Sequence, residues 1–424
     1  MNVYFDTIGC RLNQAEIERY AAQFRAAGHV IVPSASEADL VVVNTCSVTT
    51  EAASDSRQKV RQAAHAGHAQ VILTGCWATL EPGKAMNLPG VTLVVPNDRK
   101  DHLTAEVLDL ALPNFDLEPI ARQPLPGIHK RTRAFIKVQD GCNNACSYCI
   151  TRLARGRLHS ETVETVLSDI RYARAGGVQE IVLTGVHLAA WGQDLPEKRQ
   201  LSDLIRQLLA ETDVPRLRLS SLEPWDLDEA FFSLWQDKRM CPQLHLPLQS
   251  GCTATLRRMV RRITPQEFAY QINLARRIIP GVAVTTDIIV GFPGETEEEF
   301  EESLDLVHQM DFSAGHVFHF SPRPGTPAAD LPGPLTHTVL KQRSQRMRQV
   351  LAASAKVYRQ ENMGKKHTVL WERVIQQDER GWLMEGLSEN YLRIQSWLPE
   401  MRWNELDEVH ITGENGEILL AELR

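Results

Sequence analysis

Short apolar runs alternate with helical patterns at the start of the chain, and this alternation constrains the fold more than any other feature. The apolar runs are VYFDTIG, HVIV, ADLVVVNT, QVILTG and VTLVV, and amphipathic segments such as LNQAEIERYAAQFRAAG lie between them. Alternating strands and helices build parallel sheets, because each helix carries the chain back across the sheet. Residues 1–112 are therefore predicted to form an α/β domain with a Rossmann-like parallel sheet.

A second alternation follows a segment that breaks the pattern. Residues 113–130 contain four prolines and no helical periodicity, so they are predicted to be a linker. The next strand candidates are FIKVQ, EIVLTG, RLRLSS, LHLPLQS, VTTDIIVGF and GHVFHFS. Six β/α units over residues 131–360 predict an open (β/α)6 barrel, a partial TIM-type barrel with its active site at the carboxyl ends of the strands.

The last part of the chain changes character again. From about residue 335 to 360 the pattern LKQRSQRMRQVLAASAKVYRQ predicts one amphipathic helix. The short apolar runs HTVLWERV, GWLMEGL, YLRIQSW, EVHITG and EILLAEL come after it. Short strands without intervening helices favour a small OB-like β-barrel over residues 361–424. A chain of 424 residues exceeds one hydrophobic core, which agrees with three domains.

Composition excludes several classes of protein. Apolar residues make up 43% and charged residues 23% of the chain, as in ordinary globular proteins. No apolar stretch approaches the roughly 18 residues of a membrane helix, and the first residues lack a signal peptide's basic and apolar regions. A cytoplasmic protein with no membrane partner is expected. Eight cysteines are too few to stabilise a chain of this length by disulfide bonds, so metal ligation is favoured over disulfides.

The segment CNNACSYC places Cys142, Cys146 and Cys149 at CxxxCxxC spacing directly after a strand candidate. Iron–sulfur clusters normally take four thiolates, so a 4Fe-4S cluster held by three leaves one iron open. An open iron can chelate S-adenosylmethionine, and an electron from the cluster then releases a deoxyadenosyl radical. The alternatives are a zinc site or three unrelated thiols. Zinc sites usually pair CxxC with a second, distant pair, and the sequence offers none, so radical chemistry is favoured.

Three further cysteines each end an apolar run. Cys10 follows VYFDTIG, Cys46 follows LVVVNT and Cys76 follows VILTG. The carboxyl ends of parallel strands share one edge of the sheet, so the three thiols can converge there. Taken singly, each is an ordinary buried cysteine. Together they favour a second 4Fe-4S cluster, again with three protein ligands, whereas Cys241 and Cys252 have no such arrangement.

The barrel strands end in polar or glycine-rich turns. Small residues at strand ends let a cofactor approach the backbone closely, and these turns are candidates to hold S-adenosylmethionine. The GFPGETEEEF turn also reads simply as the start of an acidic helix, whose dipole favours early glutamates. With the tyrosine of the three-cysteine segment included, the candidate cofactor-binding residues are Tyr148, Thr184, Gly185, Ser221, Glu223, Gln249 and Gly291.

Charge bears on any nucleic-acid partner. The formal net charge is -7, whereas phosphate binding normally requires a basic surface. Local clusters must carry such binding, and the candidates are Lys130 to Arg133, Arg152 with Arg155 and Arg157, Arg257 to Arg262, and Lys341 to Arg348. Residues 361–424 hold 7 basic and 13 acidic side chains. Unpaired bases could instead stack on the aromatic residues Trp371, Trp382, Tyr391, Trp397 and Trp403, unless these are core residues.

These motifs resemble those of the methylthiotransferase family of radical S-adenosylmethionine enzymes, and the resemblance spans essentially the whole chain. TIGCRLNQAE, VVNTCSV and LTGC are similar to the family's three N-terminal cysteine boxes, and DGCNNACSYC is similar to its radical box. The C-terminal module resembles the TRAM domain, which is implicated in tRNA binding. The sequence departs from the family pattern at Ala145 and at Ile150 to Leu153, and neither position is a cluster ligand.

The resemblance implies a function. LTGVHLAAWG, RLSSLEPWDL, LHLPLQSG and HVFHFSPRPGTPAA look most like the branch that modifies N6-threonylcarbamoyladenosine beside the anticodon. One S-adenosylmethionine would supply a methyl group through the auxiliary cluster at Cys10, Cys46 and Cys76. A second would yield the radical that abstracts hydrogen from carbon 2 of adenine, where the methylthio group is installed. The implied partners are a tRNA anticodon stem-loop and an electron donor such as a flavodoxin or ferredoxin.

Other functions stay open at this point. The branches that act on N6-isopentenyladenosine or on a ribosomal-protein aspartate share both clusters and differ chiefly in the substrate pocket. A protein of another class, an iron–sulfur protein that binds RNA or carries electrons without turnover, would explain six thiols. It would not explain two clusters that each lack a fourth protein ligand.

Overall fold

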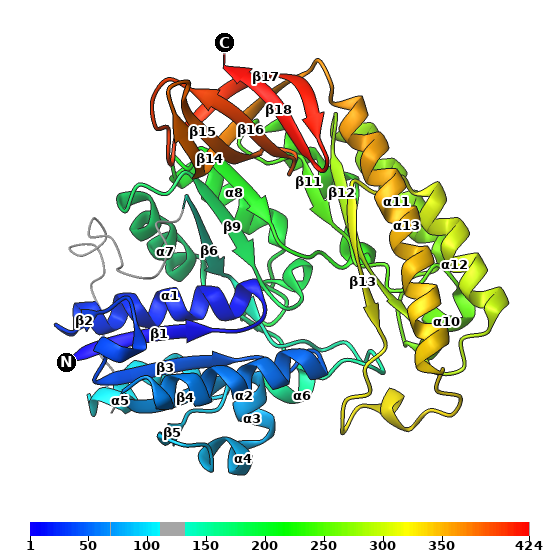
Figure 1. The fold of residues 1–424 in the computed structure, drawn as a ribbon. Coiled ribbons are helices and arrows are strands. Elements are labelled where there is room, and N and C mark those ends of the chain that lie inside the picture. Colours follow the sequence, from blue (N-terminus) through cyan, green and yellow to red (C-terminus); the bar gives the residue numbers. More distant parts are fainter. Residues whose placement is uncertain (68, 111–131, 424) are drawn as a thin grey trace.

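The computed structural model describes residues 1–67, 69–110 and 132–423, and the predicted linker at 113–130 lies outside these ranges. An N-terminal sheet, an open central barrel and a C-terminal β-barrel surround a common centre (Figure 1). None of the described helices combines the length and the apolar character that crossing a membrane requires.

The N-terminal sheet has five parallel strands in the order β2-β1-β3-β4-β5. The strands are β1 (Asn2–Thr7), β2 (Val30–Ile31), β3 (Leu40–Thr45), β4 (Gln70–Gly75) and β5 (Val91–Val94). The helices are α1 (Arg11–Ala26), α2 (Thr50–His65), α3 (Cys76–Leu80), α4 (Pro82–Met86) and α5 (Leu103–Leu108). The order of strands reverses between β1 and β3, as in doubly wound folds.

Both faces of this sheet are covered, which explains why its strands read as continuous apolar runs. Along β3, Val41 and Val43 pack into one core with α2, whereas Leu40 and Val42 pack into another with α1. The helix α1 also lies against the first strand of the barrel, β6 (Arg133–Lys137). Its outer face is therefore an interface rather than a solvated surface.

The central barrel consists of two three-stranded parallel sheets, β10-β9-β6 and β11-β12-β13. A parallel bridge between Ser221 and His245 connects them, so six strands follow one another in chain order without closing. The predicted open (β/α)6 architecture is confirmed. Its further strands are β9 (Glu180–Thr184), β10 (Arg216–Leu219), β11 (Gln243–His245), β12 (Ala283–Val290) and β13 (Ala314–His319), and a small ribbon joins β7 (Gln139–Asp140) to β8 (His159–Ser160).

Helices cover the outside of the barrel. They are α7 (Val163–Ala175), α8 (Leu201–Glu211), α9 (Glu229–Phe232), α10 (Thr253–Arg258), α11 (Pro265–Ile278) and α12 (Glu297–Gln309), whereas α6 (Thr151–Arg155) packs against α3 of the N-terminal domain. Capping boxes begin α11 at Thr264 and α12 at Thr296. The predicted strand LHLPLQS is shorter than expected, because β11 ends at His245. Pro247 lacks the N–H that a central strand needs, and Gln249 takes a positive φ of 71°.

The predicted long helix and β-barrel complete the chain. Helix α13 (His337–Glu361) lies along β13, and a closed barrel follows with strand order β14-β15-β16-β18-β17. Its strands are β14 (Lys366–Asp378), β15 (Gly381–Ser388), β16 (Arg393–Leu398), β17 (Leu406–Asn415) and β18 (Ile418–Leu423). Trp371 is fully buried in the barrel core, so it is not available to stack on a base.

Candidate functional site

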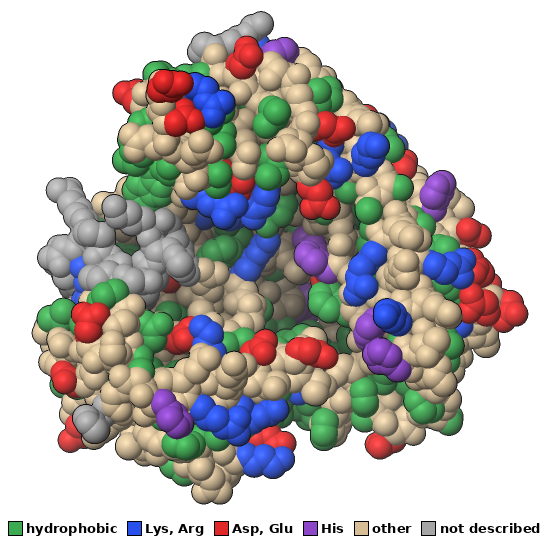
Figure 2. All heavy atoms as spheres, viewed as in Figure 1, with side chains coloured by type: hydrophobic (Ala, Val, Ile, Leu, Met, Phe, Trp, Pro, Cys, Tyr) green, Lys and Arg blue, Asp and Glu red, His purple; other side chains and the backbone are tan. Residues whose placement is uncertain are grey.

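Three thiols of the N-terminal sheet open into one cavity. Cys10 follows β1, Cys46 follows β3, and Cys76 begins α3 directly after β4. β1 and β3 flank the reversal of strand order, where open parallel sheets bind ligands. All three cysteines line a cavity of about 1120 Å³, which residues of the barrel and the C-terminal β-barrel also line. Figure 2 shows the hollow at the centre of this face. The structure thus brings the three predicted thiols together.

The Cys10 loop packs closely against Cys46. Gly9 has a φ of 108°, and a Cβ there would lie 2.6 Å from the Cys46 sulfur, so only glycine lets the Cys10 loop approach Cys46. Within the described part of the chain, no three His, Cys, Asp or Glu side chains converge closely enough to hold one metal ion.

Burial governs the protonation of these thiols. Burial, with the neighbouring Cys10 and Cys76, raises the pKa of the Cys46 thiol to about 11. Burial also raises the pKa of Cys76, against the opposing positive charge of Arg155. The Asn97 amide nitrogen donates to the Cys76 sulfur at 3.8 Å. Because metals bind thiolates, loading this site would release protons.

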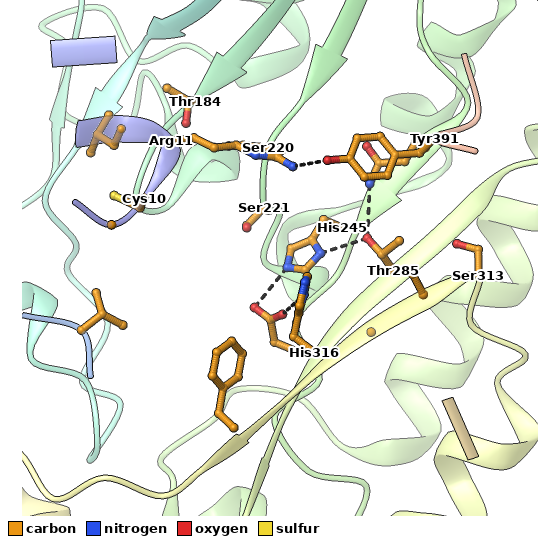
Figure 3. Close-up of a pocket in the computed structure, with 18 of the residues that line it drawn as sticks. Cys10, Arg11, Thr184, Ser220, Ser221, His245, Thr285, Ser313, His316 and Tyr391 are labelled. Carbon is orange, nitrogen blue, oxygen red and sulfur yellow. Dashed lines mark hydrogen bonds and ion pairs between the residues drawn. The ribbon is translucent and has the colours of Figure 1, made fainter. Parts of the chain in front are cut away.

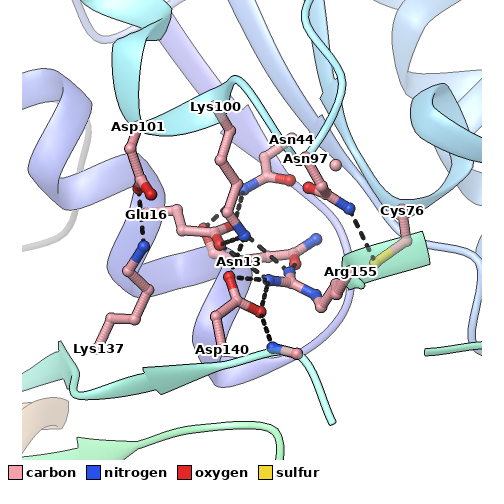
Figure 4. Close-up of polar contacts among 12 residues, drawn as sticks. Asn13, Glu16, Asn44, Cys76, Asn97, Lys100, Asp101, Lys137, Asp140 and Arg155 are labelled. Atoms are coloured by element: carbon pink, nitrogen blue, oxygen red, sulfur yellow. Dashed lines mark hydrogen bonds and ion pairs between the residues drawn. The ribbon is translucent and has the colours of Figure 1, made fainter. Parts of the chain in front are cut away.

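A buried network of charges joins the N-terminal elements to the barrel (Figure 4). Arg155, from α6, donates to Glu16 Oε1 at 2.9 Å and to Asp140 Oδ1 at 3.0 Å. Lys100 pairs with the same two carboxylates. Burial alone would raise the pKa of Glu16, but Arg155 and Lys100 lower it to about 2. Arg155 also donates to the side-chain oxygen of Asn13, so its guanidinium is fixed beside the thiol-bearing loops.

The second group of thiols lies in the loop between β7 and α6. The Cys149 N–H donates to the Cys146 carbonyl at 3.1 Å, and the Asn144 N–H donates to the Cys142 sulfur at 3.4 Å. Burial raises the pKa of Cys146 to about 11, and the neighbouring Cys149 contributes to this rise. Cys142 has the same effect on Cys149, whose pKa burial also raises. The three predicted ligands therefore lie in one short loop.

A cationic histidine stands beside this loop. His187 Nε2 lies 2.7 Å from Asp226 Oδ2, and His187 Nδ1 lies 3.4 Å from the Asn144 amide nitrogen. Burial lowers the pKa of His187, but Asp226 and Cys142 outweigh it and raise the pKa to about 9. The ring is therefore positively charged at neutral pH and faces the three-cysteine loop.

The predicted cofactor-binding residues divide into three sets. Thr184, Gly185 and Ser221 line the cavity that also holds the N-terminal thiols. Tyr148 and Glu223 lie at the three-cysteine loop, since both interact with Arg261 and with Cys146. Glu223 pairs with Arg261 at 2.9 Å.

The remaining two predicted cofactor residues have other surroundings. The Gln249 N–H donates to the Asp287 carbonyl at 2.8 Å. A Cβ at Gly291 would lie 1.9 Å from a methyl carbon of Leu340. A glycine at this position therefore lets α13 pack closely against the barrel. Among the contacts of the described residues, neither Gln249 nor Gly291 touches a cysteine of either group.

Several cavity residues were not predicted (Figure 3). His245 Nε2 and His316 Nδ1 lie 3.2 and 3.3 Å from the two carboxylate oxygens of Asp287. His245 Nδ1 lies 2.9 Å from the Thr285 hydroxyl. The available signal was the polar alternation of Thr285 and Asp287 within the apolar strand VTTDIIV, because alternate residues of a strand face the same side.

Arg11 was also missed, and so was its contact with Tyr391. The Arg11 guanidinium donates to the Tyr391 hydroxyl at 2.7 Å and lies 5.9 Å from the centres of the Tyr391 and Phe135 rings. Tyr391 was considered only as a base-stacking residue. Residues 380 positions apart in the chain meet here, and no local pattern reports such a contact.

Comparisons with known proteins agree with this arrangement. Residues 136–307 match the Radical SAM superfamily, and residues 2–96 match the Uncharacterized protein family UPF0004. The chain is 35% identical to the threonylcarbamoyladenosine tRNA methylthiotransferase MtaB of Thermotoga maritima, over 92% of this chain and 90% of that protein. It is 34% identical to the enzyme of the same name from Bacillus subtilis, over 92% and 89%.

One further relative and one solved structure are also similar to this chain. The tRNA-2-methylthio-N(6)-dimethylallyladenosine synthase of Caldicellulosiruptor saccharolyticus is 32% identical, over 90% of this chain and 83% of that protein. Among solved structures, the radical S-adenosylmethionine methyltransferase TsrM from Kitasatospora setae, with cobalamin and a [4Fe-4S] cluster bound, superimposes with a TM-score of 0.57 at 15% identity, over 77% of each chain. At that identity the superposition supports a shared fold and nothing about function.

Proposed function

The chain belongs to the radical S-adenosylmethionine family of tRNA methylthiotransferases, and we propose that its substrate is N6-threonylcarbamoyladenosine beside the anticodon, which it methylthiolates at carbon 2. Sulfur would come through an auxiliary 4Fe-4S cluster held by Cys10, Cys46 and Cys76. A second 4Fe-4S cluster, held by Cys142, Cys146 and Cys149, would bind S-adenosylmethionine. When bound, these groups supply a deoxyadenosyl radical together with the sulfur and methyl donors.

One observation carries the proposal. The cavity of about 1120 Å³ is lined at once by the three N-terminal thiols, by barrel strand ends and by the C-terminal β-barrel. A reaction that joins a radical step to sulfur insertion needs one substrate atom to reach both centres. Thr151 and Arg155, which follow the three-cysteine loop, line the same cavity. The three-cysteine loop thus leads directly into helix α6, whose residues form part of the wall of the cavity that the N-terminal thiols line.

The residues of this chain have separable roles in the proposed reaction. Because Gly9 has no side chain, Cys46 can lie close to the Cys10 loop. The buried contacts of Arg155 with Glu16 and Asp140 hold the N-terminal sheet against the barrel. A fixed distance between the two centres follows from this interface, because a buried charge network permits few alternative arrangements.

The polar lining of the cavity supports threonylcarbamoyladenosine over dimethylallyladenosine. A threonylcarbamoyl group carries a carboxylate, a hydroxyl and a urea, whereas a dimethylallyl group is a hydrocarbon. The barrel side of the cavity presents Ser313, Thr285 and the His245–Asp287–His316 group. Burying a hydrocarbon against such groups would remove water from them without supplying a hydrogen bond in return, which is unfavourable.

The proposed macromolecular partner is a tRNA anticodon stem-loop, with a flavodoxin or ferredoxin as electron donor. The loop would reach the cavity between α13 and the C-terminal β-barrel, whose residues line that side. Arg348 and Arg359 of α13 face the cavity, and Lys341 and Arg348 border a second, adjoining hollow. These basic residues would offset the acidic C-terminal β-barrel in binding phosphates.

The test uses cysteine variants of anaerobically reconstituted protein. Cys142→Ala is expected to abolish S-adenosylmethionine cleavage, because it removes a ligand of the radical cluster. Cys46→Ala is expected to retain cleavage but to lose methylthiolation of an anticodon stem-loop, measured by mass spectrometry of its nucleosides. Cys252→Ala, a buried thiol outside both groups, is the matched control and should retain both activities. Equal loss of both activities in well-folded Cys142 and Cys46 variants would contradict the proposed division of roles.

A further inference from the structure

The residue directly after Cys10 is an arginine whose guanidinium lies at the cavity wall. Arg11 is the first residue of α1, so its backbone is fixed by the helix while its side chain reaches across to the C-terminal β-barrel (Figure 3). There it donates to the Tyr391 hydroxyl at 2.7 Å. Tyr391 is itself held by Arg218, which lies 5.0 Å from its ring centre. The side chain is therefore positioned by a second domain rather than free to move.

Arg11 differs from Arg155 and Arg393, two other arginines that line the cavity. Arg155 pairs with Glu16 and Asp140, and Arg393 pairs with Glu385 at 3.1 Å. Within the described residues no carboxylate pairs with Arg11, and its one hydrogen bond goes to Tyr391. A guanidinium has five N–H donors, so most of those of Arg11 stay available to a ligand in the cavity.

The place of Arg11 relative to the sulfur centre limits which part of a substrate it can meet. Carbon 2 of adenine must approach the thiols at Cys10, Cys46 and Cys76 to receive sulfur. Carbon 2 and carbon 6 are the two neighbours of ring nitrogen 1, so a substituent on N6 starts next to the reacting edge. The residue adjoining Cys10 is therefore placed to meet that substituent, and a carboxylate on it is the group that a guanidinium binds best.

We infer that Arg11, positioned by Tyr391, binds the carboxylate of the threonyl group and is the residue that selects this substrate over N6-dimethylallyladenosine. The inference rests on the proposed function. Guanidinium and carboxylate form paired, charge-assisted hydrogen bonds of defined geometry. A dimethylallyl group offers no acceptor, so it would bury the Arg11 donors unpaired, and sites built for a polar group reject analogues that lack it.

The experiment compares stem-loop RNAs that differ only in the substituent on N6. The reconstituted protein is mixed with an anticodon stem-loop carrying threonylcarbamoyladenosine, its neutral carboxamide analogue or dimethylallyladenosine, and Kd and methylthiolation rates are measured. The wild-type protein should bind the carboxylate RNA about 10- to 100-fold more tightly than the carboxamide RNA, the range expected for a charged hydrogen bond. Arg11→Gln should bind the two RNAs equally and leave the Kd of the carboxamide RNA unchanged.

Further variants separate this role from a structural one. Tyr391→Phe removes the hydroxyl that orients Arg11 without altering the Cys10 loop, and it should lose part of the preference. Arg11→Lys should keep part of it, because the charge remains. The matched control is Arg393→Gln, whose guanidinium is already paired with Glu385. It should change the preference by less than about threefold, as for surface ion pairs.

Two results would overturn the inference. Equal weakening of both RNAs by Arg11→Gln would make Arg11 a phosphate contact, and an unchanged preference would remove it from substrate selection. Failure of the wild-type protein to methylthiolate the threonylcarbamoyladenosine RNA would instead overturn the proposed function. The two failures are therefore distinguishable.

Discussion

Replacing Arg155 by methionine tests whether the buried charge network holds the N-terminal sheet on the barrel. The Arg155 side chain is 2% exposed and contacts Glu16 and Asp140. Removing one partner of a buried ion pair costs about 3–5 kcal/mol, since the other charge stays buried. Lys100 remains to pair with both carboxylates, so we expect the lower end, about 3 kcal/mol.

Hydrogen exchange measured by mass spectrometry reports this loss where it occurs. A loss of 3 kcal/mol in the free energy of local opening speeds exchange about 10²-fold, and peptides from α1 should show it. The control is Arg346→Met, because Arg346 pairs with Glu297 and Glu301 at the surface and its side chain is 41% exposed. That change should cost less than about 1 kcal/mol. If Arg155→Met speeds exchange in α1 no more than Arg346→Met does in its own helix, the network does not hold the interface.

Three further outcomes are expected. Gly141→Ala should prevent assembly of the cluster at the three-cysteine loop, because its Cβ would lie 1.9 Å from the Arg157 carbonyl, whereas Gly156→Ala, also at positive φ but with open space around it, should retain iron. Folding lowers the pKa of Glu16 from 4.5 to about 2, so its stabilising contribution is present above pH 4.5 and is lost as the pH falls toward 2. Urea titrations at several pH values should show that the free energy of unfolding of Glu16→Gln falls less between pH 4.5 and pH 2 than that of the wild-type protein. An equal fall in the two proteins would contradict this prediction. Cys252→Ala should leave the iron content unaltered, and a loss of iron would implicate this thiol as a ligand.

The architecture followed from local sequence patterns because each pattern reports a local physical requirement. Apolar runs at regular spacing predicted the parallel strands, since strands covered on both faces must be apolar throughout. The six patterned cysteines were found for a related reason. Loops at strand ends share one edge of a sheet, so Cys10, Cys46 and Cys76 could be placed together without knowledge of side-chain packing.

The cavity wall could not be predicted in the same way. Asn13 and Glu16 read as the polar face of an amphipathic helix, but both are buried. Asn44 from β3 and Arg155 from α6 contact them, and no local pattern predicts either contact. Arg11 meets Tyr391 through the placement of two domains, which no periodicity encodes. Gly291 was proposed as a cofactor contact because it ends a strand, but the packing of α13 against it gives a sufficient structural reason for this glycine.

The central claim is that this chain holds two clusters, each on three thiolates. Anaerobic reconstitution, followed by Mössbauer spectroscopy and a count of iron and sulfide per chain, tests it most directly. The wild-type protein should hold two 4Fe-4S clusters, and the triple alanine variant of Cys10, Cys46 and Cys76 should hold one that still cleaves S-adenosylmethionine. A wild-type protein with a single cluster, or a triple variant that keeps both, would contradict the account.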